Sequence, residues 1–271
     1  MANILKKHLL VFQKIRSVTV PDNNWAADLA AWAIPKDILD QAETTPFIHP
    51  VSQFDIPKKI ELTPSHQRAR EVNPKSILDI GCGGGVASFA TDAPFVIGVD
   101  HQQGMLDLFN ENARKLGRKS ETYLGDWQKI ASEVPNADVV AVHHVLFNVP
   151  EIEKFLTNLN SHAKKRVVIE IPTKHPLSDF NPAWKHFWNI DRPTKPDGAD
   201  VVDIAKTLGI DAEYEIWLGE FGRDIDLDQT AEILQIRLCL PAARRQEVKD
   251  YLIAHPREKK RELITIWWDK N

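Results

Sequence analysis

The sequence contains little cysteine, and this argues against a fold stabilised by disulfides or by a cysteine-bound metal. Only Cys82 and Cys239 occur among 271 residues, and two cysteines neither suggest a disulfide scaffold nor supply a metal cluster. We therefore predict no metal site and a reducing compartment, the cytoplasm. Long apolar runs are also missing: no window of about 18 apolar residues suggests a membrane span, and the run near the N-terminus is too short for an export signal.

The chain also lacks a strong excess of charge of either sign. Its formal net charge is −4, so no overall field draws it to nucleic acid or to an anionic membrane. The basic residues Lys6, Lys7, Lys14 and Arg16, and those in the run at 256–262, have no interleaved aromatic residues. This favours solvated faces over RNA contacts. We expect a small-molecule partner, no nucleic acid and no membrane, and the sequence indicates no oligomeric state.

What the sequence does contain is a regular alternation of strand and helix patterns from about residue 64 onward. Strand patterns lie at 76–80, 95–100, 121–126, 137–145, 165–172, 212–218 and 261–269. Helical patterns lie at 64–72, 103–117, 150–163 and 199–209. Strands joined by helices imply crossover connections and a parallel sheet. We predict an α/β fold, a doubly wound, mostly parallel, seven-stranded Rossmann-like sheet with helical cap elements.

Three stretches fall outside this alternation: residues 1–60, 174–198 and 228–254. We predict a single domain over the whole chain, in which residues 64–218 form the cofactor-binding core and 261–269 form the last strand. The three stretches are expected to form caps along one edge of the sheet. Ligands of open α/β sheets bind beyond the carboxyl ends of the strands, so the insert at 174–198 is placed to cover a ligand.

The glycines are concentrated in one loop. Most of the glycines between Ser76 and Asp100 lie in the sequence DIGCGGG at 79–85. Glycines at the first, third and fifth positions after the dipeptide DI let a tight turn pass from strand to helix with the backbone close to a ligand. A dinucleotide-binding loop would place its third glycine at position 86, where this chain has Val86.

Two carboxylates flank this loop and indicate its ligand. Asp79 stands two residues before Gly81, where it would repel a pyrophosphate and attract a cation; alternatively, its side chain caps the following turn. Asp100, at the end of the second strand, is placed to accept hydrogen bonds from both hydroxyls of a ribose. Together the two acids predict an adenosine compound that carries positive charge, and Asp79 and Val86 argue against a nicotinamide dehydrogenase.

The motif DIGCGGG resembles the first motif of the class I S-adenosylmethionine-dependent methyltransferases, an acidic residue followed by G-x-G-x-G. The segments GDW at 125–127 and HHVLFNVPEIEKFL at 143–156 resemble those that follow the third and fourth strands of small-molecule members. The resemblance covers residues 64 to about 218. It implies a methyltransferase sheet, S-adenosylmethionine as cofactor, and methyl transfer to a small molecule by in-line displacement.

The resemblance also implies cofactor roles for particular residues. The glycine loop would lie near the methionine end, Asp100 would hold the ribose, and Asp126 and Trp127 would lie against the adenine. Asp126 could instead be a turn residue, and Trp127 a core residue. The predicted cofactor-binding residues are Asp79, Gly81, Cys82, Gly83, Gly85, Asp100, His101, Met105, Gly125, Asp126, Trp127 and His143.

Catalytic groups are harder to identify, because in-line displacement mainly requires nucleophile and methyl to be held together in a site shielded from water. A hydroxyl acceptor would benefit from a general base, and His144, Glu170 and His175 are the candidates because they lie at or beyond strand ends. Glu170 could equally be a hydrogen-bonded structural acid. One of His143 and His144 is expected to face the cofactor and the other to pack away. The signature NPPY of amino-group methylation is absent after the fourth strand, which argues against methylation of nucleic-acid amino groups.

The insert supplies the predicted substrate-binding residues, four aromatic side chains on a short helix: Phe180, Trp184, Phe187 and Trp188. Three of them share one helical face, which either lines an apolar acceptor pocket or packs against the domain. Two alternatives to a small-molecule methyltransferase remain open at this point. They are an RNA-modifying methyltransferase and a catalytically inactive S-adenosylmethionine-binding protein.

Overall fold

The structure is a computed structural model that describes residues 24–47, 51–220, 226–256, 258 and 260–270. The basic residues noted near the N-terminus lie outside this part of the chain. Within the described residues, none of the helices has the length and apolar character needed to cross a membrane.

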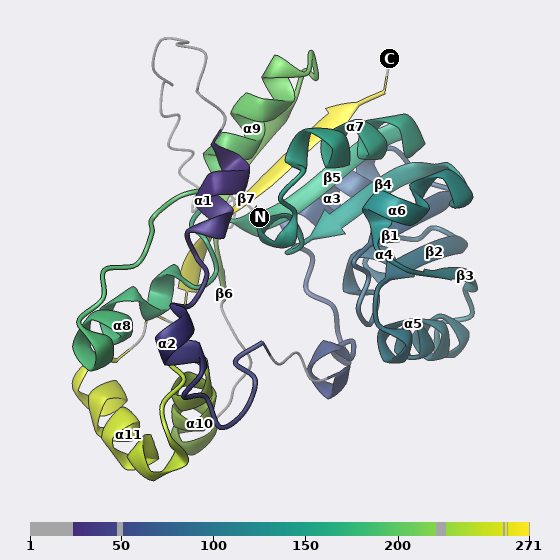
Figure 1. The fold of residues 1–271 in the computed structure, drawn as a ribbon. Coiled ribbons are helices and arrows are strands. Elements are labelled where there is room, and N and C mark those ends of the chain that lie inside the picture. The colour runs from purple at the N-terminus through teal and green to yellow at the C-terminus, as the bar shows by residue number, and fades with distance from the viewer. Residues whose placement is uncertain (1–23, 48–50, 221–225, 257, 259, 271) are drawn as a thin grey trace, which may run out of the picture.

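Seven strands form one sheet in the order β3-β2-β1-β4-β5-β7-β6 (Figure 1). Their bounds are β1 Ser76–Ile80, β2 Phe95–Asp100, β3 Lys119–Leu124, β4 Ala137–His143, β5 Ala163–Pro172, β6 Glu213–Glu220 and β7 Lys260–Asp269. Only β7 runs antiparallel to its neighbours, β5 and β6. The carboxyl ends of β1, β2, β4 and β5 therefore meet along one edge, as the alternation of sequence patterns predicted.

Helices cover both faces of the sheet. On one face lie α3 Pro64–Glu71, α4 Val86–Phe89 and α5 Gln103–Lys115, and on the other α6 Trp127–Ile130, α7 Ile152–His162 and α9 Gly198–Thr207. The remaining helices and 3-10 turns are α1 Trp25–Ala30, α2 Lys36–Leu39, η1 Val51–Phe54, η2 Ala131–Glu133, η3 Leu146–Asn148, η4 Ser178–Phe180, α8 Asn181–Trp188, α10 Leu227–Arg237, η5 Ala242–Arg244 and α11 Arg245–Ala254.

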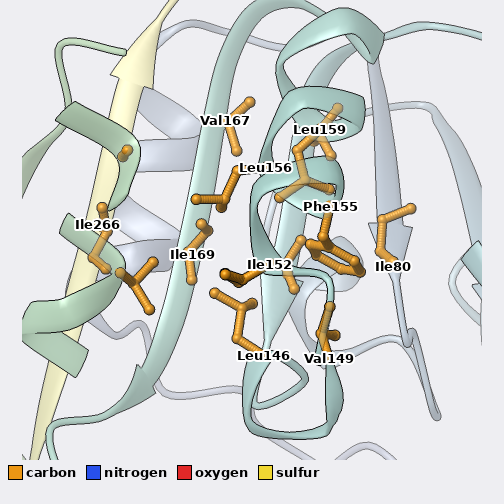
Figure 2. Close-up of a cluster of buried hydrophobic side chains, with 14 of the residues drawn as sticks. Ile80, Leu146, Val149, Ile152, Phe155, Leu156, Leu159, Val167, Ile169 and Ile266 are labelled. Atoms are coloured by element: carbon orange, nitrogen blue, oxygen red, sulfur yellow. The ribbon is translucent and has the colours of Figure 1, made fainter. Parts of the chain in front are cut away.

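Strand β5 is buried on both faces, and its alternating side chains serve two cores. Val167 and Ile169 point to the face of α7, where they join a cluster with Phe155 and Leu156 (Figure 2). Val168 joins a second cluster on the opposite face, under α3, α4 and α5. Each fully buried aliphatic or aromatic side chain contributes about 1.5–3 kcal/mol relative to an exposed one. Two well-filled cores therefore hold the carboxyl edge of the sheet as a rigid platform.

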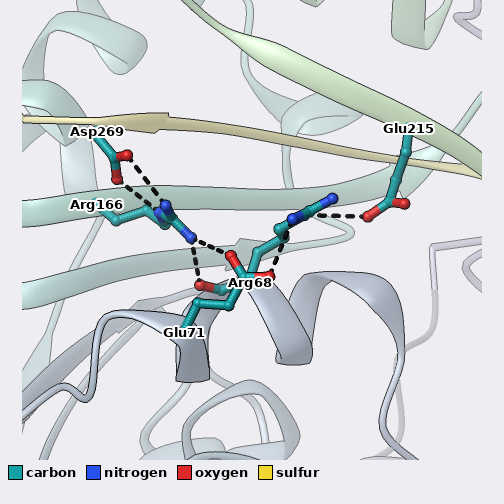
Figure 3. Close-up of polar contacts among 5 residues, drawn as sticks. All are labelled: Arg68, Glu71, Arg166, Glu215 and Asp269. Carbon is teal, nitrogen blue, oxygen red and sulfur yellow. Dashed lines mark hydrogen bonds and ion pairs between the residues drawn. The ribbon is translucent and has the colours of Figure 1, made fainter.

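Helix α3 is tied to the sheet by ion pairs at its C-terminal end (Figure 3). Arg166 of β5 donates two hydrogen bonds to Asp269 of β7, at 2.7 and 3.1 Å, and a third to Glu71 at 2.7 Å. Arg68 reaches Glu215 of β6 at 3.3 Å. These contacts set the position of α3 along β5. As a result, the N-terminal end of α3 lies against the carboxyl end of β5.

The three stretches outside the strand-helix alternation contribute to one further cluster. Side chains from 34–42, 177–190 and 231–252 pack together there, including Ile38, Trp184 and Leu234. Figure 1 shows α2, α8, α10 and α11 as a lobe beside the sheet. We call this lobe the cap. It is formed by segments distant in sequence, each of which connects back to the sheet.

Candidate active site

The loop from β1 to α4 requires glycine for both conformation and space. Gly81, Gly83 and Gly85 have φ angles of +69°, +49° and +93°, a region that other residues rarely adopt. A Cβ on Gly81 would lie 2.5 Å from Val145 Cγ2, and one on Gly84 would lie 1.9 Å from the carbonyl oxygen of Phe54. The sequence reasoning identified Gly81, Gly83 and Gly85 but missed Gly84, whose constraint comes from a residue distant in sequence.

Asp79 is buried at the end of β1, with 2% of its surface exposed. Its carboxylate accepts hydrogen bonds from the backbone N–H of Ser88 at 3.2 Å and from Ser88 Oγ at 3.0 Å. This is the capping arrangement that the sequence left as an alternative. Burial, aided by the nearby charge of Asp100, raises the pKa of Asp79 to about 7. Its role at the methionine end of a cofactor stays a prediction.

Asp100 ends β2 beside the same loop. Its two oxygens accept from the backbone N–H groups of Gly83 at 3.2 Å and Gln102 at 3.0 Å. His101 lies 3.5 Å away, with its ring mostly exposed. Each carboxylate oxygen has a second lone pair, so Asp100 keeps acceptor capacity for ribose hydroxyls. Burial, together with the charges of Asp79 and Asp100, raises the pKa of the Cys82 thiol.

The residues predicted to contact the adenine lie beyond β3 and at the start of α5. Asp126 caps α6 by accepting from the backbone N–H of Gln128 at 3.1 Å. Trp127 is buried in the core edge-on to His162, and within the described part of the chain its Nε1 has no hydrogen-bond partner. Met105 is buried as well. The structure therefore gives Asp126 and Trp127 the turn and core roles named as alternatives, and adenine contact stays a prediction.

A second polar cluster lies at the carboxyl ends of β4 and β5, on the α3 face. Its centre is Glu170, which is 4% exposed and accepts hydrogen bonds from Thr63 Oγ1 at 2.7 Å and Ser65 Oγ at 2.5 Å. His144 Nε2 lies 3.3 Å from its other oxygen. Burial acts to raise the pKa of Glu170, but the surrounding imidazoles of His143 and His144 and the Ser65 hydroxyl outweigh it and hold that pKa well below its usual range.

His143 and His66 pack together within this cluster, with ring centroids 5.2 Å apart. Burial lowers the pKa of His143 to about 3 and lowers that of His66 as well, so both rings are neutral. His66 Nδ1 accepts from the backbone N–H of Thr63 at 3.1 Å, which completes the capping box of α3. Sequence reasoning missed Thr63, Ser65 and His66, although it did predict a helix that begins at residue 64.

Comparison with known proteins identifies the region that contains the glycine loop. Residues 77–166 match a family model described as a methyltransferase domain. They form a methyltransferase domain. This confirms the family resemblance and the enzyme class predicted from the sequence. The chain matches no protein of curated function.

Solved structures confirm the fold of the methyltransferase domain and its surroundings. The BH2331 protein of Bacillus halodurans C-125, named as a methyltransferase, is 16% identical with a TM-score of 0.54, over 76% of this chain and 96% of its own. TehB from Haemophilus influenzae is 16% identical with a TM-score of 0.51, over 79% and 64%. YcgJ from Bacillus subtilis is 14% identical with a TM-score of 0.50, over 72% and 92%. At these identities the likeness establishes the Rossmann-like fold alone.

The span that matches the family model contains only part of the candidate site. It contains the glycine loop, Asp100, His143 and His144, whereas Thr63, Ser65, His66 and Glu170 lie outside it. The polar cluster is thus formed partly by the methyltransferase domain and partly by the elements packed against it. Among the described residues, no three His, Cys, Asp or Glu side chains are arranged to hold a metal ion.

His175, the third catalytic candidate, has contacts of a different kind. Its ring stacks on Trp32 with centroids 3.9 Å apart and meets Phe147 edge-on, and its Nδ1 accepts from the backbone N–H of Leu177 at 3.2 Å. Burial, followed by the charge of Arg192, lowers the pKa of His175 to about 4. The structure therefore places His175 in an aromatic contact between the N-terminal helices and the sheet.

The four aromatic residues of the insert pack within the cap. Phe180 and Trp184 are buried there, and Phe187 and Trp188 are partly buried against the same cluster. Trp188 Nε1 donates to the carbonyl oxygen of Leu238 at 2.8 Å. The structure thus gives all four a packing role. Contact with an acceptor stays a prediction for them.

Proposed function

We propose that the protein transfers a methyl group from S-adenosylmethionine to a small-molecule acceptor. The methyltransferase match over residues 77–166 is the observation that carries this proposal. The net charge of −4 supports a small molecule over nucleic acid, since no overall positive field is available to bind a polyanion.

The chemistry around the glycine loop fits this cofactor. Asp79 and Asp100 are both buried beside the loop, and among the described residues neither has an ion pair with a lysine or arginine. Such a site favours a ligand with positive charge and disfavours a pyrophosphate. S-adenosylmethionine supplies an electrophilic methyl on a sulfonium, together with an amino group and ribose hydroxyls.

The chain's own residues would bind the cofactor and shield the methyl transfer from water. The glycine loop admits the ligand close to the backbone, and Asp100 would accept from the ribose hydroxyls. The acceptor would lie at the carboxyl edge of the sheet, which the N-terminal helices also approach: Trp25 Nε1 donates to the carbonyl oxygen of Val149 at 2.7 Å. The cap beside this edge would exclude water from the methyl transfer.

Ligand-dependent thermal unfolding tests the proposal. S-adenosylmethionine and S-adenosylhomocysteine should each raise the Tm, because a ligand that binds only the folded state stabilises it by about 2.7 kcal/mol at a hundred times its Kd. NAD is the matched control, since it shares the adenosine but carries a pyrophosphate. A shift with NAD and none with S-adenosylhomocysteine would overturn the proposal. Release of S-adenosylhomocysteine across a library of small molecules would then identify the acceptor.

A further inference from the structure

We propose that His144 is the general base of this reaction and that Glu170, held by Thr63 and Ser65, is its positioning residue. The acceptor would then be a hydroxyl compound, because a hydroxyl must lose its proton as it is methylated. This inference rests on the proposed methyl transfer. It concerns the polar cluster at the ends of β4 and β5, part of which lies outside the matched domain.

The hydrogen bonds of Glu170 keep it an acceptor. Two hydroxyls, Thr63 Oγ1 and Ser65 Oγ, both donate to its Oε2 atom. Its Oε1 atom faces His144 Nε2 at 3.3 Å. A buried carboxylate with several donors remains ionised, in agreement with the direction of its pKa shift. An ionised carboxylate can only accept, so the nitrogen that faces it carries a hydrogen.

This contact determines which nitrogen of His144 can take a proton. A neutral imidazole has one N–H and one lone pair. With the hydrogen on Nε2, directed at Glu170, the lone pair is on Nδ1. Among the described residues, no hydrogen bond engages Nδ1. The side chain is 44% exposed, so an acceptor molecule can approach the ring, and we assign Nδ1 as the atom that takes its proton.

The backbone supports this orientation. His144 has a φ angle of +60°, in the left-handed region that a residue with a side chain seldom occupies and that often marks functional sites. Its N–H donates to the carbonyl oxygen of Glu170 at 2.7 Å, so the two residues are joined through both backbone and side chain. The next residue, Val145, packs against Gly81. His144 is therefore adjacent to the loop that would hold the methyl donor.

The other imidazoles of the cluster are not alternatives. His66 is buried, and His143 packs its ring against that of His66. His66 serves the arrangement indirectly, because its Nδ1 accepts from the Thr63 N–H. That capping contact places the hydroxyls of Thr63 and Ser65 at the start of α3, where they reach Glu170.

With His144 as the base, every bond and proton of the methyl transfer is accounted for. The acceptor O–H bond breaks and its proton passes to His144 Nδ1, while the oxygen forms a bond to the methyl carbon. The carbon–sulfur bond breaks, and its electron pair stays on sulfur, which becomes a neutral thioether. The imidazolium formed on His144 is stabilised by Glu170 and returns its proton to solvent.

Tautomer measurement tests the positioning role without any acceptor. At about pH 8, proton–nitrogen NMR correlation on the full chain should show the His144 hydrogen on Nε2. In Glu170→Gln, the amide oxygen should face the two hydroxyls and the amide nitrogen should face His144. The ring would then accept at Nε2 and carry its hydrogen on Nδ1. His255→Asn, an exposed change on the cap, is the control and should leave the His144 signals unchanged.

An Nδ1–H tautomer in the wild type, or an unchanged tautomer in Glu170→Gln, would overturn the positioning role. Calorimetry with S-adenosylhomocysteine on the same samples separates this result from the proposed function. Normal binding with the wrong tautomer would reject only the base, whereas absent binding in the wild type would reject the methyltransferase proposal itself.

Turnover of matched acceptors tests the base directly. In a library that pairs each hydroxyl compound with its thiol analogue, His144→Ala should reduce kcat for hydroxyl acceptors about a hundredfold or more, with KM within about threefold of the wild type. At about pH 9 a thiol as acidic as cysteine, with a pKa of about 8.5, is mostly ionised and needs no base, so thiol analogues of that acidity should lose far less. Equal losses for both members of a pair, or wild-type turnover of no hydroxyl compound, would contradict the proposal.

Discussion

Two carboxylates buried at the carboxyl edge of the same sheet are held in opposite states. Asp79 is the penultimate residue of β1 and Glu170 lies near the end of β5, and both are almost fully buried. Burial raises the pKa of Asp79 to about 7, whereas the pKa of Glu170 lies well below its usual range. Burial alone therefore does not determine the charge of an acid in this protein.

The pKa values of Asp79 and Glu170 differ because the groups around the two carboxylates differ. Asp79 accepts from two groups of one residue, Ser88, and faces a second acid, Asp100. Glu170 accepts from two hydroxyls on another helix and has imidazoles beside it. The β1 side of the edge thus has two acids and, among the described residues, no lysine or arginine paired with either of them, as the proposed cationic ligand would require. On the β5 side, the hydroxyls of Thr63 and Ser65 already donate to Glu170, as the proposed positioning role would require.

Removing Glu170 should have the largest effect. Glu170→Ala leaves Thr63, Ser65 and His144 without their shared acceptor in a buried site, and loss of one partner from a buried polar pair costs about 3–5 kcal/mol. Urea unfolding at about pH 7 should show this loss in the free energy of unfolding. Glu170→Gln keeps the volume and one acceptor oxygen, and it should lose less. A loss below about 1 kcal/mol in the Ala variant would contradict the network.

Substitution of Asp79, unlike that of Glu170, should stabilise the protein, and the size of this effect should depend on pH. A carboxyl whose pKa is raised on folding, here from 3.8 to about 7, stabilises the folded state below about pH 4, and this contribution is lost as the pH rises through 7. Asp79→Asn should match the wild type near pH 4 and be more stable near pH 8, by on the order of 2–4 kcal/mol.

The difference between variant and wild type is the quantity to measure, because His143 and His175 act in the other direction. Their pKa values are lowered on folding, to about 3 and about 4, so their contributions grow as the pH rises toward 6.5. Both are present in each protein and cancel in the comparison. A pH-independent difference would show that Asp79 is not perturbed.

Asp100 should affect ligand binding more than folding. A hydrogen bond to a charged group contributes about 1.5–3 kcal/mol, so Asp100→Ala should weaken S-adenosylhomocysteine binding about ten- to a hundredfold. Calorimetry measures this change, and circular dichroism checks that the fold is retained. Unchanged affinity in a folded variant would place the ribose elsewhere.

The smallest expected effect is the difference in stability loss between two matched serine substitutions. Ser65 and Ser88 are both fully buried, and each donates its hydroxyl to one of the two acids. Near pH 6, Ser65→Ala removes a bond to an ionised carboxylate and should cost about 1.5–3 kcal/mol, whereas Ser88→Ala removes a bond to a mostly neutral carboxyl and should cost about 1 kcal/mol. Equal losses would mean that the two acids have the same charge.

Much of the fold and of the ligand loop could be predicted from the sequence because both depend on short-range patterns. The buried strands and the helices between them follow from periodicity, and the observed sheet has the seven strands expected. The acid, the glycines and Asp100 lie within 25 residues of each other, so strand and turn geometry sets their relation directly. Asp126 and Trp127 show the limit of such motifs, because the same spacing suits a turn with a core residue.

The polar cluster could not be predicted in this way, because tertiary packing assembles it. Ser65 and Glu170 are 105 residues apart in sequence, and His175 meets Trp32 through the fold alone. Residue types suggested three candidate bases without ranking them. The ion pairs that place α3 along β5 bring two hydroxyls onto Glu170 and so determine its charge. The sequence by itself determined the chain's architecture and the glycine loop with its two acids; only the tertiary structure decided which buried acid is ionised, because that depends on neighbours from distant segments.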